Sequence, residues 1–198
     1  MCVFFSFLAL RDGRVLHHDM LDSHEDLVDL FNLRDTHMQH FVRGELRPGA
    51  NLCDIDTYTF HLDEDEAPSW WNCETADGVE QEVRRRVSAM IRTSGNIALM
   101  ADGCLILGGT ATIVKMVAGR VICLQDSAQV GKMQDSARVG VMRNSAQVGK
   151  MQDSARVGEM QDSAQVGEMQ DSAQVEKMWG SAQAPRAPNS EFRKETES

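Results

Sequence analysis

Histidine and cysteine side chains that could bind a metal are present in this sequence, but their spacing is not typical of a metal site. His37 and His40 lie three residues apart, and His61, Cys53 or Cys73 could complete a set of zinc ligands. Structural zinc sites are usually built from two close pairs such as C-x-x-C. The sequence contains no such second pair. We therefore predict no metal and no cofactor, with the histidines serving as ordinary surface and core residues.

Cys2 is the side chain with the most plausible catalytic chemistry. If Met1 is removed, the α-amino group of Cys2 can act as the base that activates its own thiol, as in N-terminal-nucleophile hydrolases. The apolar stretch from Val3 to Leu10 suits the strand that follows the nucleophile in those enzymes. The expected oxyanion and substrate-binding motifs are not recognisable here. A small hydrolase or amidotransferase that uses Cys2 is therefore the alternative function, and not the preferred one.

An acidic run followed by two tryptophans, in residues 63–71, is the strongest candidate for a partner-binding site. Acidic runs are more often solvated loops than binding patches, and tryptophans that follow a proline such as Pro68 often anchor a loop to the core. An exposed tryptophan, in contrast, is a typical hot spot of a protein interface. The candidate partner-binding residues are Asp63, Glu64, Asp65, Glu66, Trp70 and Trp71.

The acidic charge of the chain is concentrated in its first half. Residues 1–100 contain twice as many Asp and Glu as Lys and Arg, whereas the two kinds are nearly balanced in residues 101–198. With a pI near 5.0, direct nucleic-acid binding is disfavoured, because it depends on Lys and Arg that neutralise phosphates. An acidic surface that imitates nucleic acid would instead bind a protein. The basic triplet Arg84 to Arg86 is expected to pair with nearby carboxylates.

The cysteine content and the hydropathy pattern predict a cytoplasmic protein. The five cysteines are odd in number and dispersed, which favours free thiols over a disulfide framework. The apolar start, Met1 to Leu10, lacks the basic region and the cleavage site of a signal peptide. No apolar run approaches the roughly 20 residues that a membrane span needs. We therefore expect no membrane contact.

The first hundred residues predict an α+β domain that must position these side chains. Most aromatic residues lie here, which indicates a compact core. Alternating apolar residues around a D-G turn predict a hairpin, and two capping patterns predict helix starts. The predicted elements are strands at Val3 to Leu10, Val15 to His18 and Tyr58 to Leu62, a helix after Ser23 with Leu27, Leu30 and Phe31 on its apolar face, and a helix from Asp77 to about Arg92 with Val79, Val83, Val87 and Met90 on one face.

The second half of the chain is a nine-residue repeat. Ser-Ala recurs every nine residues from Ser127 to Ser181, and Val and Met recur with the same spacing, which gives the consensus S-A-Q-V-G-K/E-M-Q-D. Degenerate copies extend the pattern back to about residue 101. We therefore divide the chain into an acidic α+β domain at 1–100, a repeat region at 101–183 and a disordered tail at 184–198.

A period of nine excludes a simple helix or a straight strand. Nine residues make two and a half helical turns, and nine is odd, so successive valines would face opposite sides in either structure. A chain that bends once per repeat keeps Ala, Val and Met inside, so we predict a parallel β-solenoid with two repeats per coil. Gly131 and the equivalent glycines of other repeats are expected at the corners with positive φ. A disordered tract rich in Gln, Ser and Gly is the alternative.

The order of these features resembles uncharacterised proteins of bacteria and their phages. Those proteins begin with M-C-x-F-F and carry an acidic segment similar to DEDEAPSWW (here residues 63–71), a helix, a G-G pair (here Gly108 and Gly109) and long D-S-A-Q-V arrays. The resemblance covers most of the chain and implies the same architecture and a microbial or phage-like source. It implies no chemistry, and it assigns no functional residue.

The near-identity of the repeat copies favours a spacer, a scaffold or a periodic binding face over a catalyst, because an active site needs rungs that differ. The diversity of residue types in residues 1–100 instead places specificity in that domain. We therefore predict a non-enzymatic interaction protein that binds a protein partner, such as a host factor, through its acidic domain. The oligomeric state is open, and the end or edge of a solenoid can also support self-association.

Overall fold

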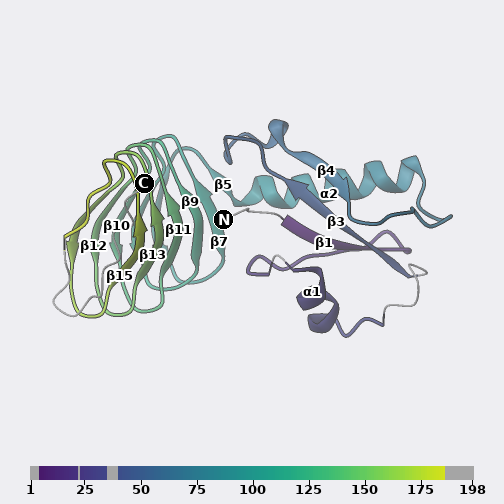
Figure 1. Ribbon diagram of the computed structural model, residues 1–198, viewed down its shortest axis with the longest axis horizontal. Coiled ribbons are helices and arrows are strands. Elements are labelled where there is room, and N and C mark those ends of the chain that lie inside the picture. Colours follow the sequence, from purple (N-terminus) through teal and green to yellow (C-terminus); the bar gives the residue numbers. More distant parts are fainter. Residues whose placement is uncertain (1–4, 22, 35–39, 186–198) are drawn as a thin grey trace. The chain divides into compact units, whose positions relative to one another are not determined.

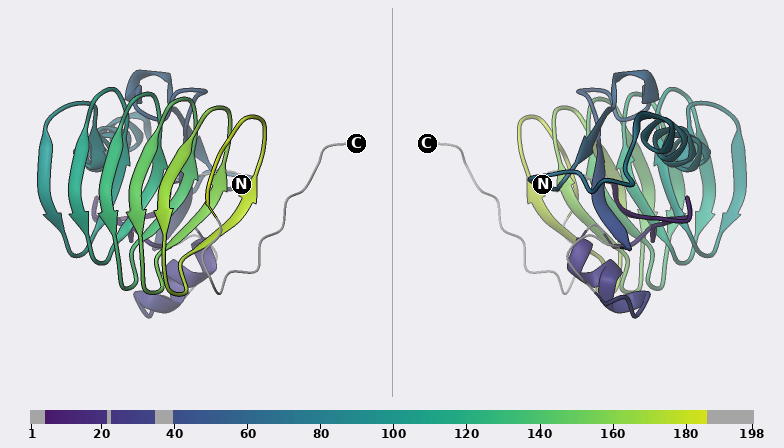
Figure 2. Two further views of the ribbon diagram at one scale, coloured as in Figure 1. Left: turned by 90° about the vertical axis from the view of Figure 1, so that its left-hand side faces the viewer. Right: turned by 90° about the vertical axis from the view of Figure 1, so that its right-hand side faces the viewer.

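The computed structural model describes residues 5–21, 23–34 and 40–185, and the chain divides into two compact units, Met1–Ala89 and Met90–Ser198. The first unit is α+β, and the second is a solenoid of stacked coils (Figures 1 and 2). Both parts of the predicted fold class are therefore confirmed. Residues 186–198, which make up most of the predicted tail, lie outside the described residues.

The first unit is built on a four-stranded antiparallel sheet with the strand order β2-β1-β3-β4. Its strands are β1 (Phe5–Leu10), β2 (Val15–Leu16), β3 (Phe41–Arg47) and β4 (Thr59–Leu62). Its helical elements are α1 (His24–Leu30), η1 (Ile55–Thr57) and α2 (Cys73–Met90). The hairpin of β1 and β2 is the one predicted around the D-G turn, whereas strand β3 was not predicted from the sequence.

Helix α1 begins where the sequence predicts. The Ser23 hydroxyl accepts a hydrogen bond from the backbone N–H of Asp26 at 3.3 Å, which is the geometry of an N-cap. Leu27 is fully buried in one cluster with the leucines of β1. Leu30, in contrast, is 51% exposed, and Val28 packs against the cluster together with the predicted Phe31, so the apolar face of α1 differs from the predicted one at Leu30.

Helix α2 begins earlier than predicted. The Asn72 side-chain oxygen accepts a hydrogen bond from the backbone N–H of Thr75 at 2.9 Å, so the helix starts at Cys73 and not near Asp77. Asparagine is among the best N-cap residues, and here Asn72 sets the start of the helix ahead of the Asp77 and Glu80 pattern from which the start was predicted. No helix among the described residues combines the length and the apolarity that a membrane crossing requires.

One face of α2 is buried and one arginine fastens the helix to the segment before β4. The buried residues are those predicted: Val79, Val83, Val87 and Met90. The guanidinium of Arg84 donates hydrogen bonds to the carbonyl oxygens of Ile55 at 2.8 Å and Tyr58 at 2.7 Å. Arg84 also pairs with Glu80 one turn earlier, so its position is fixed from two sides.

The second unit is a solenoid of two parallel sheets, in which each nonapeptide forms one strand and consecutive strands alternate between the sheets. Val130 pairs with Val148 two repeats later, so one coil takes two repeats, as predicted. The even sheet contains β6 (Asn96–Met100), β8 (Thr112–Met116), β10 (Gln129–Met133), β12 (Gln147–Met151) and β14 (Gln165–Met169). The odd sheet contains β5 (Ile91–Arg92), β7 (Cys104–Leu107), β9 (Arg120–Leu124), β11 (Arg138–Met142), β13 (Arg156–Met160) and β15 (Gln174–Met178).

The solenoid begins before the recognisable repeats. Strand β6 lies in register with β8, with Ile97 opposite Ile113 and Met100 opposite Met116. These positions are those of Val and Met in the later repeats. The first coils therefore keep the inward apolar residues but lack the Ser-Ala pair that makes the later copies easy to recognise.

Three inward columns form the core of the solenoid. The Ala, Val and Met of each repeat from Ala128 to Met178 are at most 7% exposed. Adjacent strands of a sheet lie about 4.8 Å apart, so each of these side chains rests on the same residue of the neighbouring coil. The alternative prediction of a disordered tract is therefore wrong for these residues.

The glycines of the repeat do not form the corners, so that prediction is wrong. Neither Gly131 nor its equivalents have a positive φ, and a Cβ at Gly149 would lie 2.6 Å from the carbonyl oxygen of Gly131. These glycines instead allow the backbones of successive coils to approach closely. The corners have φ between 52° and 58° and are formed by Asp126, Asp135, Asn144, Asp153, Asp162 and Asp171. Asp and Asn tolerate this left-handed conformation better than other residues with a side chain.

The corner side chains also join successive coils. A carboxylate oxygen of Asp162 accepts a hydrogen bond from the backbone N–H of Asn144 at 2.9 Å, and Asp126 does the same for Gly109 at 2.9 Å. The Asn144 amide in turn donates to Asp126 at 3.1 Å. Each corner residue therefore supplies both a left-handed turn and a bond to a neighbouring coil.

We expect Asp162→Ala to lower the free energy of unfolding by about 1–3 kcal/mol, because alanine loses the inter-coil hydrogen bond and disfavours the left-handed backbone. Asp162→Gly should cost less, since glycine adopts a positive φ readily. Urea unfolding followed by circular dichroism measures both variants. Equal stability of the alanine and glycine variants would contradict the conformational part of this explanation.

Candidate interaction surfaces

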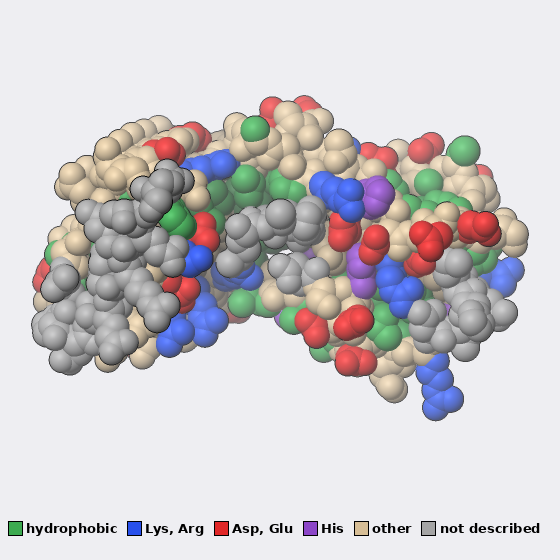
Figure 3. All heavy atoms as spheres, viewed as in Figure 1, with side chains coloured by type: hydrophobic (Ala, Val, Ile, Leu, Met, Phe, Trp, Pro, Cys, Tyr) green, Lys and Arg blue, Asp and Glu red, His purple; other side chains and the backbone are tan. Residues whose placement is uncertain are grey.

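The predicted acidic run is only partly available to a partner. The backbone N–H of Asp63 donates to the carbonyl oxygen of Arg43 at 3.0 Å, which extends the pairing of β3 and β4. Glu64 accepts from the backbone N–H of Arg43 at 2.9 Å and turns towards β3. Asp65 and Glu66 are exposed. Asp and Glu side chains, drawn in red in Figure 3, gather over the first unit, which contains this run.

The burial of the two tryptophans is intermediate between the two predicted alternatives, an exposed hot spot and a buried anchor. Trp70 and Trp71 are both half-buried, and their rings meet edge to face with centroids 5.8 Å apart. The backbone N–H of Trp71 donates to the carbonyl oxygen of Pro68 at 2.8 Å, which closes a turn. Each indole is therefore held in place while part of its surface stays open to a partner.

The basic triplet of α2 pairs within its own helix, as predicted. Arg85 and Arg86 both donate to the carboxylate of Glu82, with contacts between 2.7 and 2.8 Å. The hydrogen bonds from Arg85 and then Arg86 lower the pKa of Glu82 to about 2. Because these charges are satisfied locally, the triplet is not a free basic patch.

The residues weighed as zinc ligands do not come together among the described residues. Cys2, the nucleophile of the alternative function, and His37, one member of the His37–His40 pair, lie outside those residues. The ligand atoms of His40, His61, Cys53 and Cys73 form no group of metal-binding size within the described chain. A different group does: His24, Glu45 and Asp63 place one ligand atom each within 4.8 Å of one another.

Two of the described cysteines, Cys104 and Cys123, are buried, and the thiol of Cys123 is chemically shielded. Cys123 lies inside the second unit, and burial raises the pKa of its thiol to about 11. Such a thiol carries little thiolate at neutral pH and is a poor nucleophile. Cys73, in contrast, is exposed, and Cys53 is half-buried.

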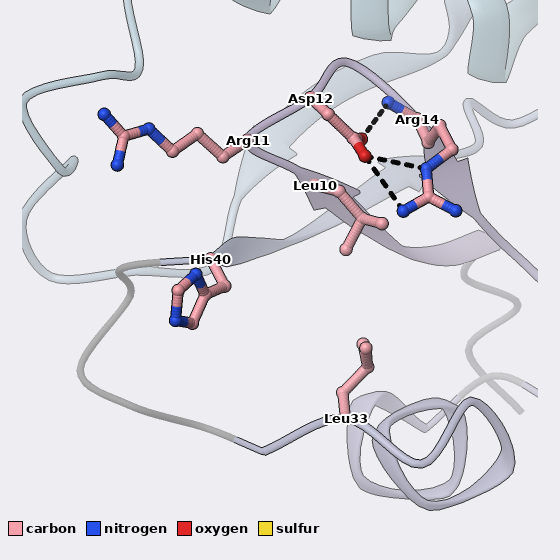
Figure 4. Close-up of a pocket in the computed structure, with 6 residues that line it drawn as sticks. All are labelled: Leu10, Arg11, Asp12, Arg14, Leu33 and His40. Carbon is pink, nitrogen blue, oxygen red and sulfur yellow. Dashed lines mark hydrogen bonds and ion pairs between the residues drawn. The ribbon is translucent and has the colours of Figure 1, made fainter.

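A hollow of about 420 Å³ lies beside the hairpin turn of the first unit (Figure 4). Its lining residues are Leu10, Arg11, Asp12, Arg14, Leu33 and His40. The backbone N–H and then the side chain of Arg14 donate to Asp12 at 3.1 and 2.9 Å, and these bonds lower the pKa of Asp12. Arg11 points away from this pair in Figure 4. None of the six residues carries a hydroxyl or a thiol, and the ionisable groups other than arginine that line the hollow are the Asp12 carboxylate and the His40 imidazole.

A column of arginines runs along the odd sheet of the solenoid. Arg120, Arg138 and Arg156 are direct register partners in β9, β11 and β13. Arg138 and Arg156 are exposed, and no carboxylate among the described residues forms an ion pair with any of the three. Like charges at a spacing of about 4.8 Å repel one another, so this column favours binding of an anionic group.

The even sheet carries a weaker counterpart. Lys115, Lys132 and Lys150 are register partners in β8, β10 and β12, and the next position is Glu168. Lys150 and Glu168 form an ion pair at 3.2 Å, and all three lysines are half-buried. This column is therefore partly neutralised, which leaves the arginine column as the stronger candidate for an anionic ligand.

The arginine column is hidden in the consensus of the repeat, because a consensus averages over all copies. Arg follows Ser-Ala at Arg138 and Arg156, whereas Gln fills the same position at Gln129 and Gln147. With two repeats per coil, this alternation places every such arginine on one sheet. A period of two repeats in the polar positions is the signal that identifies the surface.

The sequence matches no family model, no curated protein and no solved structure.

Proposed function

We propose that this is a non-enzymatic interaction protein whose solenoid binds an extended acidic segment of a partner protein. The observation that carries the proposal is the in-register column of Arg120, Arg138 and Arg156, which has no carboxylate partner within the described chain. Guanidinium groups bind carboxylates with two parallel hydrogen bonds, and one arginine per coil matches a linear ligand that lies along the stack. The near-identity of the coils suits such a periodic contact.

The loop of residues 63–71 supplies specificity in this proposal. Asp65 and Glu66 are exposed, and the edge-to-face pair of Trp70 and Trp71 is half-buried. Aromatic residues of this kind, held in one orientation, lose little entropy on binding and are frequent hot spots. The partner would then present a basic or apolar patch to this loop and an acidic segment to the solenoid.

A protein partner fits the charge of the chain better than nucleic acid does. The net charge is −10, and three arginines supply little of the phosphate neutralisation on which nucleic-acid affinity depends. The odd number and dispersed positions of the five cysteines support the reducing cytosol as the compartment. In the phage-like setting that the sequence resemblance implies, the partner is a host protein.

We expect the triple substitution Arg120→Gln, Arg138→Gln and Arg156→Gln to weaken binding of fluorescein-labelled poly-L-glutamate by about tenfold. Each exposed charge pair contributes roughly 0.2–1 kcal/mol, so the loss of three pairs has this size. Glutamine already occupies the same position in other copies, such as Gln129 and Gln147, so the solenoid should fold normally. Fluorescence anisotropy at low salt measures the affinity.

The matched control is the triple substitution Lys115→Gln, Lys132→Gln and Lys150→Gln, which removes the same charge from the other sheet. It should retain most of the affinity for poly-L-glutamate. An equal loss in the lysine variant would mean that only overall charge matters, and the proposed surface would be abandoned. Tighter binding to a single-stranded oligothymidylate than to the acidic peptide would overturn the choice of a protein partner.

A further inference from the structure

We propose that His24, Glu45 and Asp63 bind one divalent transition-metal ion, with Zn²⁺ as the best fit. Their ligand atoms lie within 4.8 Å of one another, and they come from the start of α1, the middle of β3 and the residue after β4. These three residues differ from the histidines and cysteines whose spacing in the sequence led to the prediction of no metal. The proposal does not depend on the proposed function.

The backbone around the three side chains fixes their positions. Ser23 caps α1, so His24 is the first residue of the helix. Glu45 lies on β3 opposite His61 of β4, and the backbone N–H of Asp63 donates to the carbonyl oxygen of Arg43 on β3. Pairing of β3 with β4 therefore sets the separation of the two carboxylates. The N-cap at Ser23 fixes the start of α1 and with it the position of the His24 imidazole.

The hydrogen bonds of His24 direct one ring nitrogen towards a cation. Its Nε2 lies 3.0 Å from the carbonyl oxygen of Gly44, and because a carbonyl only accepts, Nε2 carries the hydrogen. In the neutral ring, Nδ1 then presents a lone pair to an oxygen of Asp63 at 3.2 Å. Two lone pairs at this distance repel unless a cation, either a proton or a metal ion, lies between them. A backbone carbonyl that orients the far nitrogen is a common feature of histidine metal ligands.

The distance between these two atoms also suits a shared ion. Ligands about 2.1 Å from one metal ion lie about 3.0–3.4 Å apart in octahedral to tetrahedral geometry. Glu45 is held by Arg47, whose Nε donates to one carboxylate oxygen at 2.8 Å, and a carboxylate oxygen of Glu45 is the third member of the group. Glu64, the neighbouring acid, bonds to Arg43 and is not part of the group.

The group is buried on the side of His24 and Glu45 and open to solvent on the side of Asp63. The side chains of His24 and Glu45 are 11% and 16% exposed, whereas that of Asp63 is 49% exposed. A hollow of about 480 Å³, lined by residues 61–65, lies beside Asp63 and gives access from solvent. One imidazole and two carboxylates favour zinc over calcium and magnesium, which prefer oxygen ligands alone. An ion held here would tie α1 to the sheet.

The test is isothermal titration of the full-length, chelator-treated protein with ZnCl₂ at neutral pH. We expect one equivalent to bind, the melting temperature to rise, and the ¹⁵N resonance of His24 Nδ1 to shift on binding. Asp63→Asn and His24→Gln should each weaken this binding at least tenfold. Asp65→Asn removes the same charge two residues further along the loop and should leave the binding unchanged.

Three results would overturn the site. The first is the absence of stoichiometric binding, which would mean that a proton occupies the space between His24 and Asp63. The second is an equal loss of affinity in Asp63→Asn and Asp65→Asn, which would indicate diffuse attraction to the acidic loop. The third is binding that survives both Asp63→Asn and His24→Gln, which would place the ion elsewhere. Circular dichroism of each variant shows that the fold is intact.

Discussion

Deleting residues 136–153 is expected to leave a folded protein that still binds poly-L-glutamate. Deleting only residues 136–144 is also expected to leave a folded protein, but one that has lost most of this binding. The first deletion removes a whole coil, so β13 moves next to β9 and Arg156 stacks on Arg120. The second removes half a coil, so every later strand changes sheets. Arg156 then lies on the even sheet, and Arg120 is left without an arginine neighbour.

The two deletions are closely matched. Both remove Arg138 and Arg143, and the longer one additionally removes only one cation and one anion, Lys150 and Asp153. Both should fold, because the inward Ala, Val and Met are the same in every copy and because solenoid stability depends on contacts between neighbouring coils. Binding should therefore separate the variants while thermal melts do not. We expect the half-coil deletion to bind several times more weakly, as the loss of one further charge pair implies.

Two outcomes would contradict this reasoning. If the half-coil deletion binds as tightly as the whole-coil deletion, the ligand does not recognise a column on one sheet. If the half-coil deletion fails to unfold cooperatively, the two sheets are not interchangeable and the corner contacts distinguish them. The Arg to Gln variant still tests the arginine column in that second case.

The solenoid is the part of the fold that the sequence predicts best, because its core residues recur at a fixed spacing that only a bending chain can bury. The residues that form the corners are harder to predict from the sequence. A positive φ is usually assigned to glycine, and most copies of the repeat contain a glycine. Here, however, Asp takes the left-handed position, and a glycine such as Gly149 allows close contact with Gly131 on the neighbouring coil. Whether Asp or Gly takes the positive φ depends on where in the repeat the chain bends. The nine-residue period shows that the chain bends once per repeat but not at which residue.

The central strand β3 and the proposed metal site are not predicted for a related reason. Gly44 and three charged residues weaken the strand signal of Phe41–Arg47, and the side chains that surround this strand come from distant parts of the chain. His24, Glu45 and Asp63 meet only once β3 is placed between β1 and β4. Sequence spacing within one element therefore cannot reveal this group.

The second large effect is expected at Gly44, where we predict that alanine destabilises the first unit by about 1–3 kcal/mol. Gly44 lies opposite Phe7 in the pairing of β3 with β1, and Phe7 is fully buried. A Cβ at Gly44 would lie 2.2 Å from Cζ of the Phe7 ring, which also stacks on Phe60 with centroids 5.4 Å apart. The ring cannot move without disturbing this stack, so the cost follows from overpacking.

The control is Gly78→Ala in α2, where a Cβ would meet nothing within 4 Å. This variant should be more stable by roughly 0.5–1 kcal/mol, because alanine favours the helix over the unfolded chain. Urea unfolding followed by tryptophan fluorescence measures both variants, since Trp70 and Trp71 lie in the first unit. A Gly44→Ala protein as stable as the unmodified chain would mean that the strands separate to accept the new side chain.

A double-substitution cycle identifies the cause of the loss at Gly44. Phe7→Leu shortens the side chain that the new Cβ would strike, and alone it should be destabilising because it removes buried area and the stack on Phe60. Combined with Gly44→Ala, it should cost less than the sum of the two single changes, since the steric conflict exists only when Phe7 is present. Additive losses would show that alanine acts through the strand itself. The glycine would then be required by the backbone of β3 and not by the aromatic ring that covers it.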